Sequence, residues 1–218
     1  MTQIVPNSFL FQFSLQIPRV DAMPGGRGRL LKLPESSTLF VPARLNSEQM
    51  PMSVRMAWNP EGLGLEVRVR GKAQPAAGRW ADLKHSDLVR VLLDMRPGTN
   101  VQRVTDYCVE LVALICDDDA DDAATVRFTE SGPQRPGRRT LDSGKCRVER
   151  HLVADGYDLS LWIPGSQLPG YEQAVEAGLL GFYCIVEDTE IGPVPLSVLG
   201  DFPATWNPSL WIPLELKS

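Results

Sequence analysis

The sequence predicts an all-β protein, a jelly-roll-like sandwich of two antiparallel sheets with few short helices. Apolar and polar residues alternate with a period of two along many segments, which is typical of strands with one buried and one exposed face. Turn-forming residues separate these segments at short intervals. Helical periodicity is weak, and the best candidates are the short stretches Gly165–Leu168 and Tyr171–Ala177.

The alternation begins near the N-terminus and continues to the C-terminus. The first expected strand places the apolar side chains of residues 9–17 on one side, and Gln12, Ser14 and Gln16 interrupt it. Later strands with the same pattern are expected at residues 63–69, 157–163 and 210–216. Each should turn one face to the core and the other to solvent.

Continuous apolar runs indicate central strands that are covered on both faces. These runs are Leu88–Leu93, Val109–Ile115 and Leu179–Val186. Hairpin turns are expected at Asn59–Gly62 and at Asp155-Gly156, because each lies between two apolar strands. Further reversals are expected at 24–26, 97–100 and 142–144, and long loops at 23–29, 72–84 and 131–139.

Length and charge limit the function classes. The 218 residues fit one sandwich domain over residues 1–218, large enough to need no metal or disulfide. The net charge of −5 argues against binding to nucleic acid or to anionic membranes. The sequence has no apolar run long enough to span a membrane and no signal-peptide pattern, so we expect a cytoplasmic protein.

Cysteine and histidine are too scattered for a zinc site. The cysteines at 108, 116, 146 and 184 form no C-x-x-C pair, and His85 and His151 are the two histidines. We expect buried thiols rather than a disulfide framework, and no resident metal or cofactor. The one exception to consider is calcium at the acidic run Asp117–Asp122, which lacks the spacing that wraps an ion and fits a solvated hairpin tip better.

No catalytic signature is present, so we expect a protein that is not an enzyme. The common nucleophile, zinc-protease and nucleotide-binding motifs are missing. His85-Ser86-Asp87 brings suitable residue types together, but neighbours in a strand point to opposite faces, which favours a structural transition from loop to strand.

The tryptophans are candidates for either packing or ligand binding. Trp58 is in phase with core residues, whereas Trp162 and Trp211 occupy the outward phase of their strands. Trp80 lies in a loop and Trp206 precedes the last strand, so both could stack on a flat ligand such as a sugar ring.

Two stretches resemble carbohydrate-binding module family 9 and the related DOMON-type sandwiches. The first is K-H-S-D-L-V-R-V-L-L-D-M-R at Lys84–Arg96, and the second is Gly156–Leu216, with G-Y-D-L-S-L-W-I-P, L-G-F-Y-C-I-V-E-D-T-E and P-S-L-W-I-P-L-E-L. Together they cover about half of the chain. The resemblance implies a β-sandwich and a sugar held between two tryptophans with charged side chains around it.

Carried over to this sequence, the resemblance implies that Trp80 and Trp206 stack on the ligand while Asp94 and Arg96 hydrogen-bond to it. The chain departs from the family pattern in two respects. Trp80 stands unusually far before Asp87, and Arg90 occupies a position where the family commonly has a carboxylate.

Three functions therefore remain open. The leading one is a non-catalytic module that binds a saccharide or a similar polar ligand. The alternative is a structural or protein-interaction domain, as a homo-oligomer or with another protein, that uses Trp162 or Trp211 for contact. The third is an enzyme accessory domain or a haem-binding relative, for which His85, His151 and the methionines are the available axial ligands.

Overall fold

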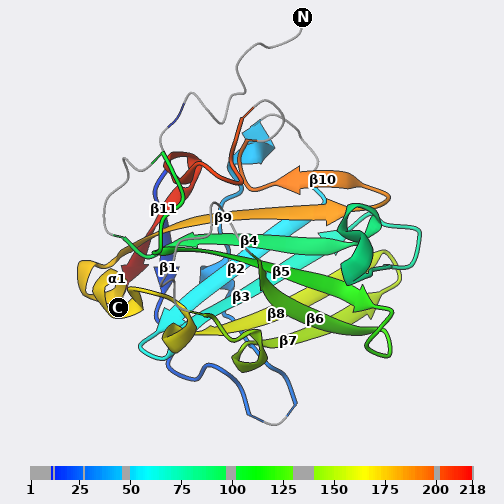
Figure 1. Ribbon diagram of the computed structural model, residues 1–218, viewed down its shortest axis with the longest axis horizontal. Helices are drawn as coiled ribbons and strands as arrows, with labels where there is room; N and C mark the ends of the chain where they lie inside the picture. Colours follow the sequence, from blue (N-terminus) through cyan, green and yellow to red (C-terminus); the bar gives the residue numbers. More distant parts are fainter. Residues whose placement is uncertain are drawn as a thin grey trace, which may run out of the picture.

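Two β-sheets stack face to face in the computed structural model of the protein (Figure 1). The structure describes residues 11, 13–26, 28–45, 50–96, 102–129, 140–198 and 202–217. The expected turn at 97–100, the loop at 131–139 and the first residues of the expected N-terminal strand lie outside this part of the chain.

The larger sheet has seven strands in the order β1-β11-β9-β4-β5-β6, with β10 also paired to β9. Its strands are β1 Leu15–Pro18, β4 Leu88–Asp94, β5 Cys108–Asp117, β6 Ala123–Thr129, β9 Leu179–Asp188, β10 Gly192–Pro195 and β11 Ile212–Lys217. The smaller sheet has the order β2-β3-β8-β7. Its strands are β2 Met52–Asn59, β3 Gly62–Arg70, β7 Arg147–Val153 and β8 Gly156–Pro164. The predicted two-sheet sandwich is confirmed.

Helices are short. Among the described residues, one α-helix, α1 Tyr171–Ala177, follows β8, and the other helical segments are 3₁₀ turns. These are η2 Glu35–Ser37, η3 Pro42–Leu45, η4 Trp80–His85, η5 Ser143–Lys145, η6 Gly165–Gln167 and η7 Pro208–Leu210. No helix in the described ranges is both long and apolar enough to cross a membrane.

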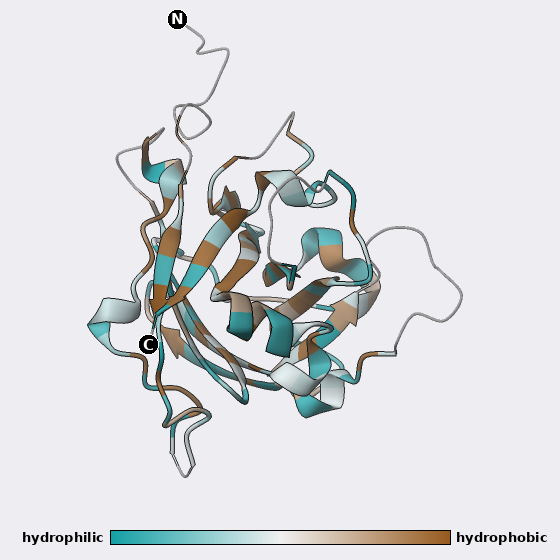
Figure 2. Ribbon diagram, turned by 90° about the vertical axis from the view of Figure 1, so that its left-hand side faces the viewer, coloured by the Kyte–Doolittle hydropathy of each residue, from teal (hydrophilic) through white to brown (hydrophobic). Residues whose placement is uncertain are grey.

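Alternation of side chains builds the core between the sheets, and it is visible as bands of brown and teal along the strands in Figure 2. Val54, Met56, Leu65 and Val67 project from the smaller sheet, and all four are buried. The hairpins expected at Asn59–Gly62 and at Asp155-Gly156 join β2 to β3 and β7 to β8. The three predicted central strands are confirmed as β4, β5 and β9.

The turn between β2 and β3 is held by the helix α1. The Tyr171 hydroxyl at the start of α1 lies 2.7 Å from both the Asn59 and the Gly62 carbonyl oxygens. The Tyr171 ring lies directly on Gly165, where a Cβ atom would come within 2.4 Å of Cδ1. Glycine is therefore required at this position for the helix to dock.

Strand β1 differs from expectation in length and direction. It covers only Leu15–Pro18, and Phe11 before it is exposed. It also pairs with β11 in parallel, whereas the sequence predicted antiparallel sheets throughout. The alternation of side chains within a strand reports which residues are buried. It does not report whether two strands far apart in the sequence pair in parallel or antiparallel.

The two tryptophans in outward phase are covered by the chain itself. Trp162 packs with Ala57 under a loop that contributes Met23, Leu30 and Leu31. Trp211 is also buried, and its indole N–H donates to the Ala204 carbonyl at 2.6 Å. The prediction that Trp162 or Trp211 is available for a protein partner is therefore wrong.

Candidate functional site

The outer face of the larger sheet carries most of the candidate residues. Val89, Val91 and Leu93 of β4 point into the core, so Arg90 and Asp94 in the alternate positions point to the outer face. The register places Arg90 beside Val112 of β5 and Ile185 of β9. Arg127 of β6 lies opposite Val112, so this row continues to the edge of the sheet.

Trp80 lies on this face, at the end where β4 begins. Trp80 and Leu83 of η4 pack against Leu88, Val112 and Leu114 of the sheet. The Trp80 indole N–H donates to Thr125 Oγ1 at 2.9 Å. The Arg127 guanidinium stands over the indole ring, 4.3 Å from its centroid. Trp80 is thus a fixed, partly buried aromatic with a cation on one face.

The chain before η4 fits tightly against β5, which brings Trp80 to this position. Gly78 lies so close to the strand that a Cβ atom would come within 2.2 Å of the Cys116 carbonyl oxygen. The Asp118 N–H donates to the Gly78 carbonyl at 3.0 Å. A larger residue at 78 would displace the segment that carries Trp80.

Arg90 lies between two carboxylates in the row next to Trp80. Its Nε donates to Glu187 Oε1 at 2.8 Å, and its Nη1 pairs with Glu110 Oε1. Burial disfavours the charged guanidinium, but the hydrogen bond to Glu187 and the charges of both carboxylates outweigh this and raise the pKa of Arg90. The Arg90 and Glu187 side chains keep 19% and 32% of their surface exposed. The cluster is therefore held in place yet reachable from solvent.

Asp94 and Arg96 form a pair at the opposite end of β4. Arg96 Nη2 donates to Asp94 Oδ2 at 2.9 Å, and Arg96 Nε donates to Asp94 Oδ1 at 3.1 Å. The guanidinium lies 6.0 Å from the centroid of the exposed Tyr107 ring. Since Asp94 is buried, it fixes Arg96 beside an accessible aromatic ring.

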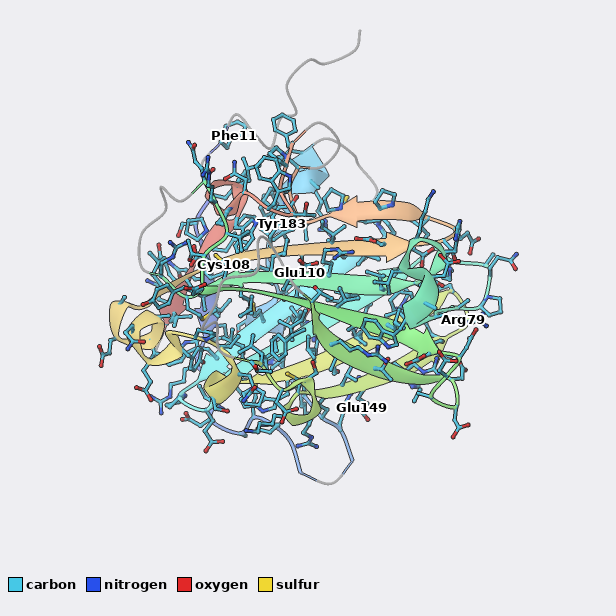
Figure 3. The ribbon with its side chains drawn as sticks, viewed as in Figure 1. Phe11, Arg79, Cys108, Glu110, Glu149 and Tyr183 are labelled. Carbon is cyan, nitrogen blue, oxygen red and sulfur yellow. The ribbon has the colours of Figure 1, made fainter. Side chains whose placement is uncertain are left out.

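The predicted site residues do not all come together. Asp94 and Arg96 meet, but Trp80 precedes the first residue of β4 and Asp94 is the last. In Figure 3, Arg79 beside Trp80 and Cys108 beside Asp94 lie at opposite ends of the face. Trp206 is 58% exposed, and its segment 202–211 lies near the start of β11, away from η4 (Figure 1). Among the described residues, no ring contact joins Trp80 to Trp206.

Known structures share this arrangement of strands. The chain is similar to a family 9 carbohydrate-binding module from Caldicellulosiruptor kristjanssonii, in structures described as complexes with cellotriose and with glucose. Identity is 14% in both cases, the TM-score is 0.60, and the matches cover 94% of this chain and 94% or 96% of those chains. The fold is that of a family 9 carbohydrate-binding module.

A third similar structure is described as a putative carbohydrate-binding protein from Bacteroides uniformis ATCC 8492. It is 12% identical, with a TM-score of 0.53, and the match covers 94% of this chain and 99% of that chain. No protein-family profile and no curated protein matches the sequence. The resemblance noted in the sequence is confirmed at the level of the fold.

In this family 9 fold, the S-D segment serves the structure of the sandwich. Asp87 is fully buried, accepts from the Thr189 N–H at 2.7 Å and from the Ala77 N–H at 2.9 Å, and lies 3.2 Å from Lys72 Nζ. Lys72 Nζ also pairs with Asp188 Oδ1 at 3.1 Å and is only 2% exposed. Burial lowers the pKa of Lys72, but Asp188 and Asp87 outweigh this effect and raise it.

Sequence reasoning missed this cluster of Lys72, Asp87 and Asp188. Lys72 lies in an expected loop, and loop lysines are usually solvated. The available signal was that Asp87 and Asp188 each border a fully apolar strand, where a charge requires a partner. Glu110 and Glu187 were missed for the same reason, because they lie inside or beside central strands.

The remaining motifs also have local roles. Ser86 Oγ accepts from the Arg79 N–H at 2.9 Å and donates to the Asp82 carbonyl, which confirms the structural interpretation of His85-Ser86-Asp87. Asp117–Asp122 includes the turn between β5 and β6, as expected, and Asp118 pairs with Arg79. Within the described ranges, no group of three or more His, Cys, Asp or Glu side chains is arranged to hold a metal ion.

Proposed function

We propose that the protein is a non-catalytic saccharide-binding module, and that the sugar contacts the outer face of the larger sheet beside Trp80 and Arg90. The observation that carries this proposal is the partly exposed pair of Arg90 and Glu187 near a fixed indole. Guanidinium and carboxylate groups bind sugar hydroxyls as donors and acceptors, while an aromatic edge or face covers the C–H surface of the ring.

The departure at Arg90 is compatible with this proposal. The family commonly has a carboxylate at that position, and here Glu110 and Glu187 on the neighbouring strands supply carboxylates beside Arg90. Acceptors for sugar hydroxyls are thus present at the same place on the face, although they come from other strands. The similar structures described as holding glucose and cellotriose support this class of ligand.

Asp94, Arg96 and Trp206 remain proposed contacts at other places. Asp94 and Arg96, with Tyr107, form a second polar and aromatic group at the far end of β4. The strand from Leu88 to Asp94 spans about 20 Å at roughly 3.3 Å per residue, so one monosaccharide cannot touch both ends. We propose that only a longer oligosaccharide would reach Arg96.

The test is a titration of glucose, xylose and cello-oligosaccharides followed by tryptophan fluorescence and calorimetry. We expect Glu187→Gln to weaken binding about tenfold, because a charge-assisted hydrogen bond is lost while Glu110 still neutralises Arg90. Glu172→Gln, an exposed change on α1, is the matched control and should leave binding unchanged. Absence of binding for every sugar would refute the proposal.

A second candidate function is protein interaction, supported by one group of exposed aromatic rings. The Phe13 ring lies 6.2 Å from the Phe11 ring and 5.7 Å from the Phe40 ring, and Phe11 and Phe40 are both exposed. A Phe11→Ser Phe40→Ser variant should lower self-association in sedimentation velocity if these rings form a contact. If the wild type and the variant both sediment as monomers, the exposed phenylalanines do not mediate self-association.

A further inference from the structure

The outer face of the smaller sheet contains a polar cleft that is separate from the face discussed above. It is a shallow depression that is open to solvent. Its lining includes Arg29, Ser53, Glu66, Arg68, Asp158 and Ser160. We propose that this cleft is a second binding site, whose ligand is a sugar acid, a saccharide that carries a carboxylate.

The floor of the cleft follows from the strand register. Ser53, Arg68 and Asp158 lie in one row across β2, β3 and β8, because their Cα atoms are paired partners. Glu66 and Ser160 lie in the next row of the same face. Side chains on one face of a sheet would by themselves form a flat, solvated surface. A further segment must therefore form a wall of the cleft.

The wall is the loop that also covers Trp162. The Gly25 N–H donates to the Leu30 carbonyl at 2.7 Å, which closes the loop on itself. The Leu30 N–H donates to Glu149 Oε2 at 2.7 Å and ties the loop to β7. Figure 3 shows Glu149 beside this loop at the lower edge of the smaller sheet. Arg29, next to that anchor, is thereby placed at the cleft.

Two arginines in the cleft are already oriented. Arg68 Nε pairs with Asp158 Oδ1 at 3.2 Å, and Arg70 Nη2 reaches the same oxygen at 2.6 Å. Arg55 also lines the cleft, and its Nη2 pairs with the exposed Glu35 carboxylate at 2.5 Å. Arg55 also donates to Thr38 Oγ1 at 3.2 Å and to the Leu33 carbonyl at 3.5 Å, so its guanidinium is fixed in position. Because both guanidinium groups are already held, they lose little entropy when a ligand arrives.

Other polar groups in the cleft are unused. Within the described part of the chain, no hydrogen bond or ion pair engages the Arg29 guanidinium or the hydroxyls of Ser53 and Ser160. Ser160 is only 9% exposed, so its hydroxyl has few waters as alternative partners. Glu66 accepts one long bond, from the Leu33 N–H at 3.5 Å. Three donors and one carboxylate therefore converge on the cleft with few protein partners.

This combination of groups selects the ligand chemistry. Among the lining residues, Arg55 is paired with Glu35 and Arg68 with Asp158. Arg29 has no carboxylate partner within the described part of the chain, and this unpaired cation favours a ligand with a negative charge. A simple anion would be repelled by Glu66, whereas a hydroxylated anion can donate hydroxyl protons to it. A sugar acid satisfies both, with its carboxylate toward Arg29 and its hydroxyls toward Glu66 and the serines.

The experiment is calorimetric titration of the full chain with D-glucuronate, D-glucose and inorganic phosphate at low salt. We expect glucuronate to bind most tightly and added salt to weaken it. Arg29→Gln should reduce the glucuronate affinity about tenfold, and Ser160→Ala should reduce it by about threefold. Arg44→Gln, the same change at an exposed arginine on η3, should have no effect.

The result can be separated from the proposal for the larger sheet. Glu187→Gln should leave glucuronate binding intact, even if neutral sugars fail to bind anywhere. Equal affinity for phosphate and glucuronate would show a simple anion site and overturn the inference. Failure of glucuronate to bind, or full affinity in Arg29→Gln, would overturn it as well.

Discussion

Two basic residues near the same end of the larger sheet have contrasting surroundings. Lys72 is enclosed by Asp87 and Asp188 and is nearly inaccessible to solvent, whereas Arg90 lies between Glu110 and Glu187 with part of its surface open. Burial lowers the pKa of both cations, but their carboxylate partners outweigh it and raise both pKa values. The two clusters therefore differ in solvent access rather than in the direction of their pKa shifts.

The closed cluster should give the largest effect on stability. We expect Lys72→Met to lower the free energy of unfolding by about 3–5 kcal/mol, because Asp87 and Asp188 would remain buried without a counter-charge. Urea denaturation followed by tryptophan fluorescence measures this change. Lys145→Met, an exposed control on η5, should shift the value by less than about 0.5 kcal/mol. A loss below about 1 kcal/mol for Lys72→Met would contradict the difference between the two clusters.

High pH should lower the stability of the fold through ionisable groups in its interior. Burial raises the pKa of the Cys116, Cys146 and Cys184 thiols to about 12. An acid whose pKa is raised in the folded state contributes full stability below its unfolded pKa, near 9.0, and loses it as the pH rises toward the folded value. Lys72, a base with a raised pKa, likewise loses its contribution only above its ordinary value.

Stability should therefore be flat near neutral pH and fall above about pH 9. One buried thiol accounts for roughly 1 kcal/mol between about pH 9 and pH 10. Cys184→Ala should flatten the fall by about that amount in urea titrations at both pH values, whatever it costs at neutral pH. An unchanged slope in this variant would show that Cys184 ionises freely in the folded protein.

The open cluster should show a smaller stability change and a clear effect on binding. We expect Glu187→Gln to cost at most about 1 kcal/mol of stability, because the Glu187 carboxylate is partly exposed and Glu110 still pairs with Arg90. The same variant is expected to weaken sugar binding, as described above. A stability loss comparable to that of Lys72→Met would show that the ion pair of Arg90 and Glu187 stabilises the fold as strongly as the buried cluster of Lys72.

Trp206 should give the smallest effect on stability. Its side chain is largely exposed, so Trp206→Ala should change the free energy of unfolding by less than about 0.5 kcal/mol. Sugar affinity measured on the same sample tests the predicted stacking role. An affinity equal to that of the wild type would remove Trp206 from the proposed contacts.

Much of the fold could be predicted because local alternation reports directly on burial. Strands β3, β8 and β9 and the hairpin turn at Asn59–Gly62 follow from residues that are close in sequence. The parallel pairing of β1 with β11 could not be predicted, because it joins segments from opposite ends of the chain. The burial of Trp162 could not be predicted either, because the loop that packs on it has no periodic pattern in its sequence.

The candidate site was predictable only in its local parts. Asp94 and Arg96 are two residues apart, so their pairing needs little information about the fold. Whether Trp80 lies near Arg96 depends on which end of β4 each residue adjoins and on what covers the sheet between them. Arg90 illustrates the limit, because its partners come from β5 and β9 and neither adjoins it in sequence.

The parallel contact between β1 and β11 has a mechanical consequence. The chain enters this pair at Leu15 and leaves it at Lys217, at opposite ends of the two strands. A pull on both ends would load the hydrogen bonds between β1 and β11 in shear, so that they would have to break together rather than one after another. A module joined to neighbours on both sides would therefore resist tension along the chain at this seam.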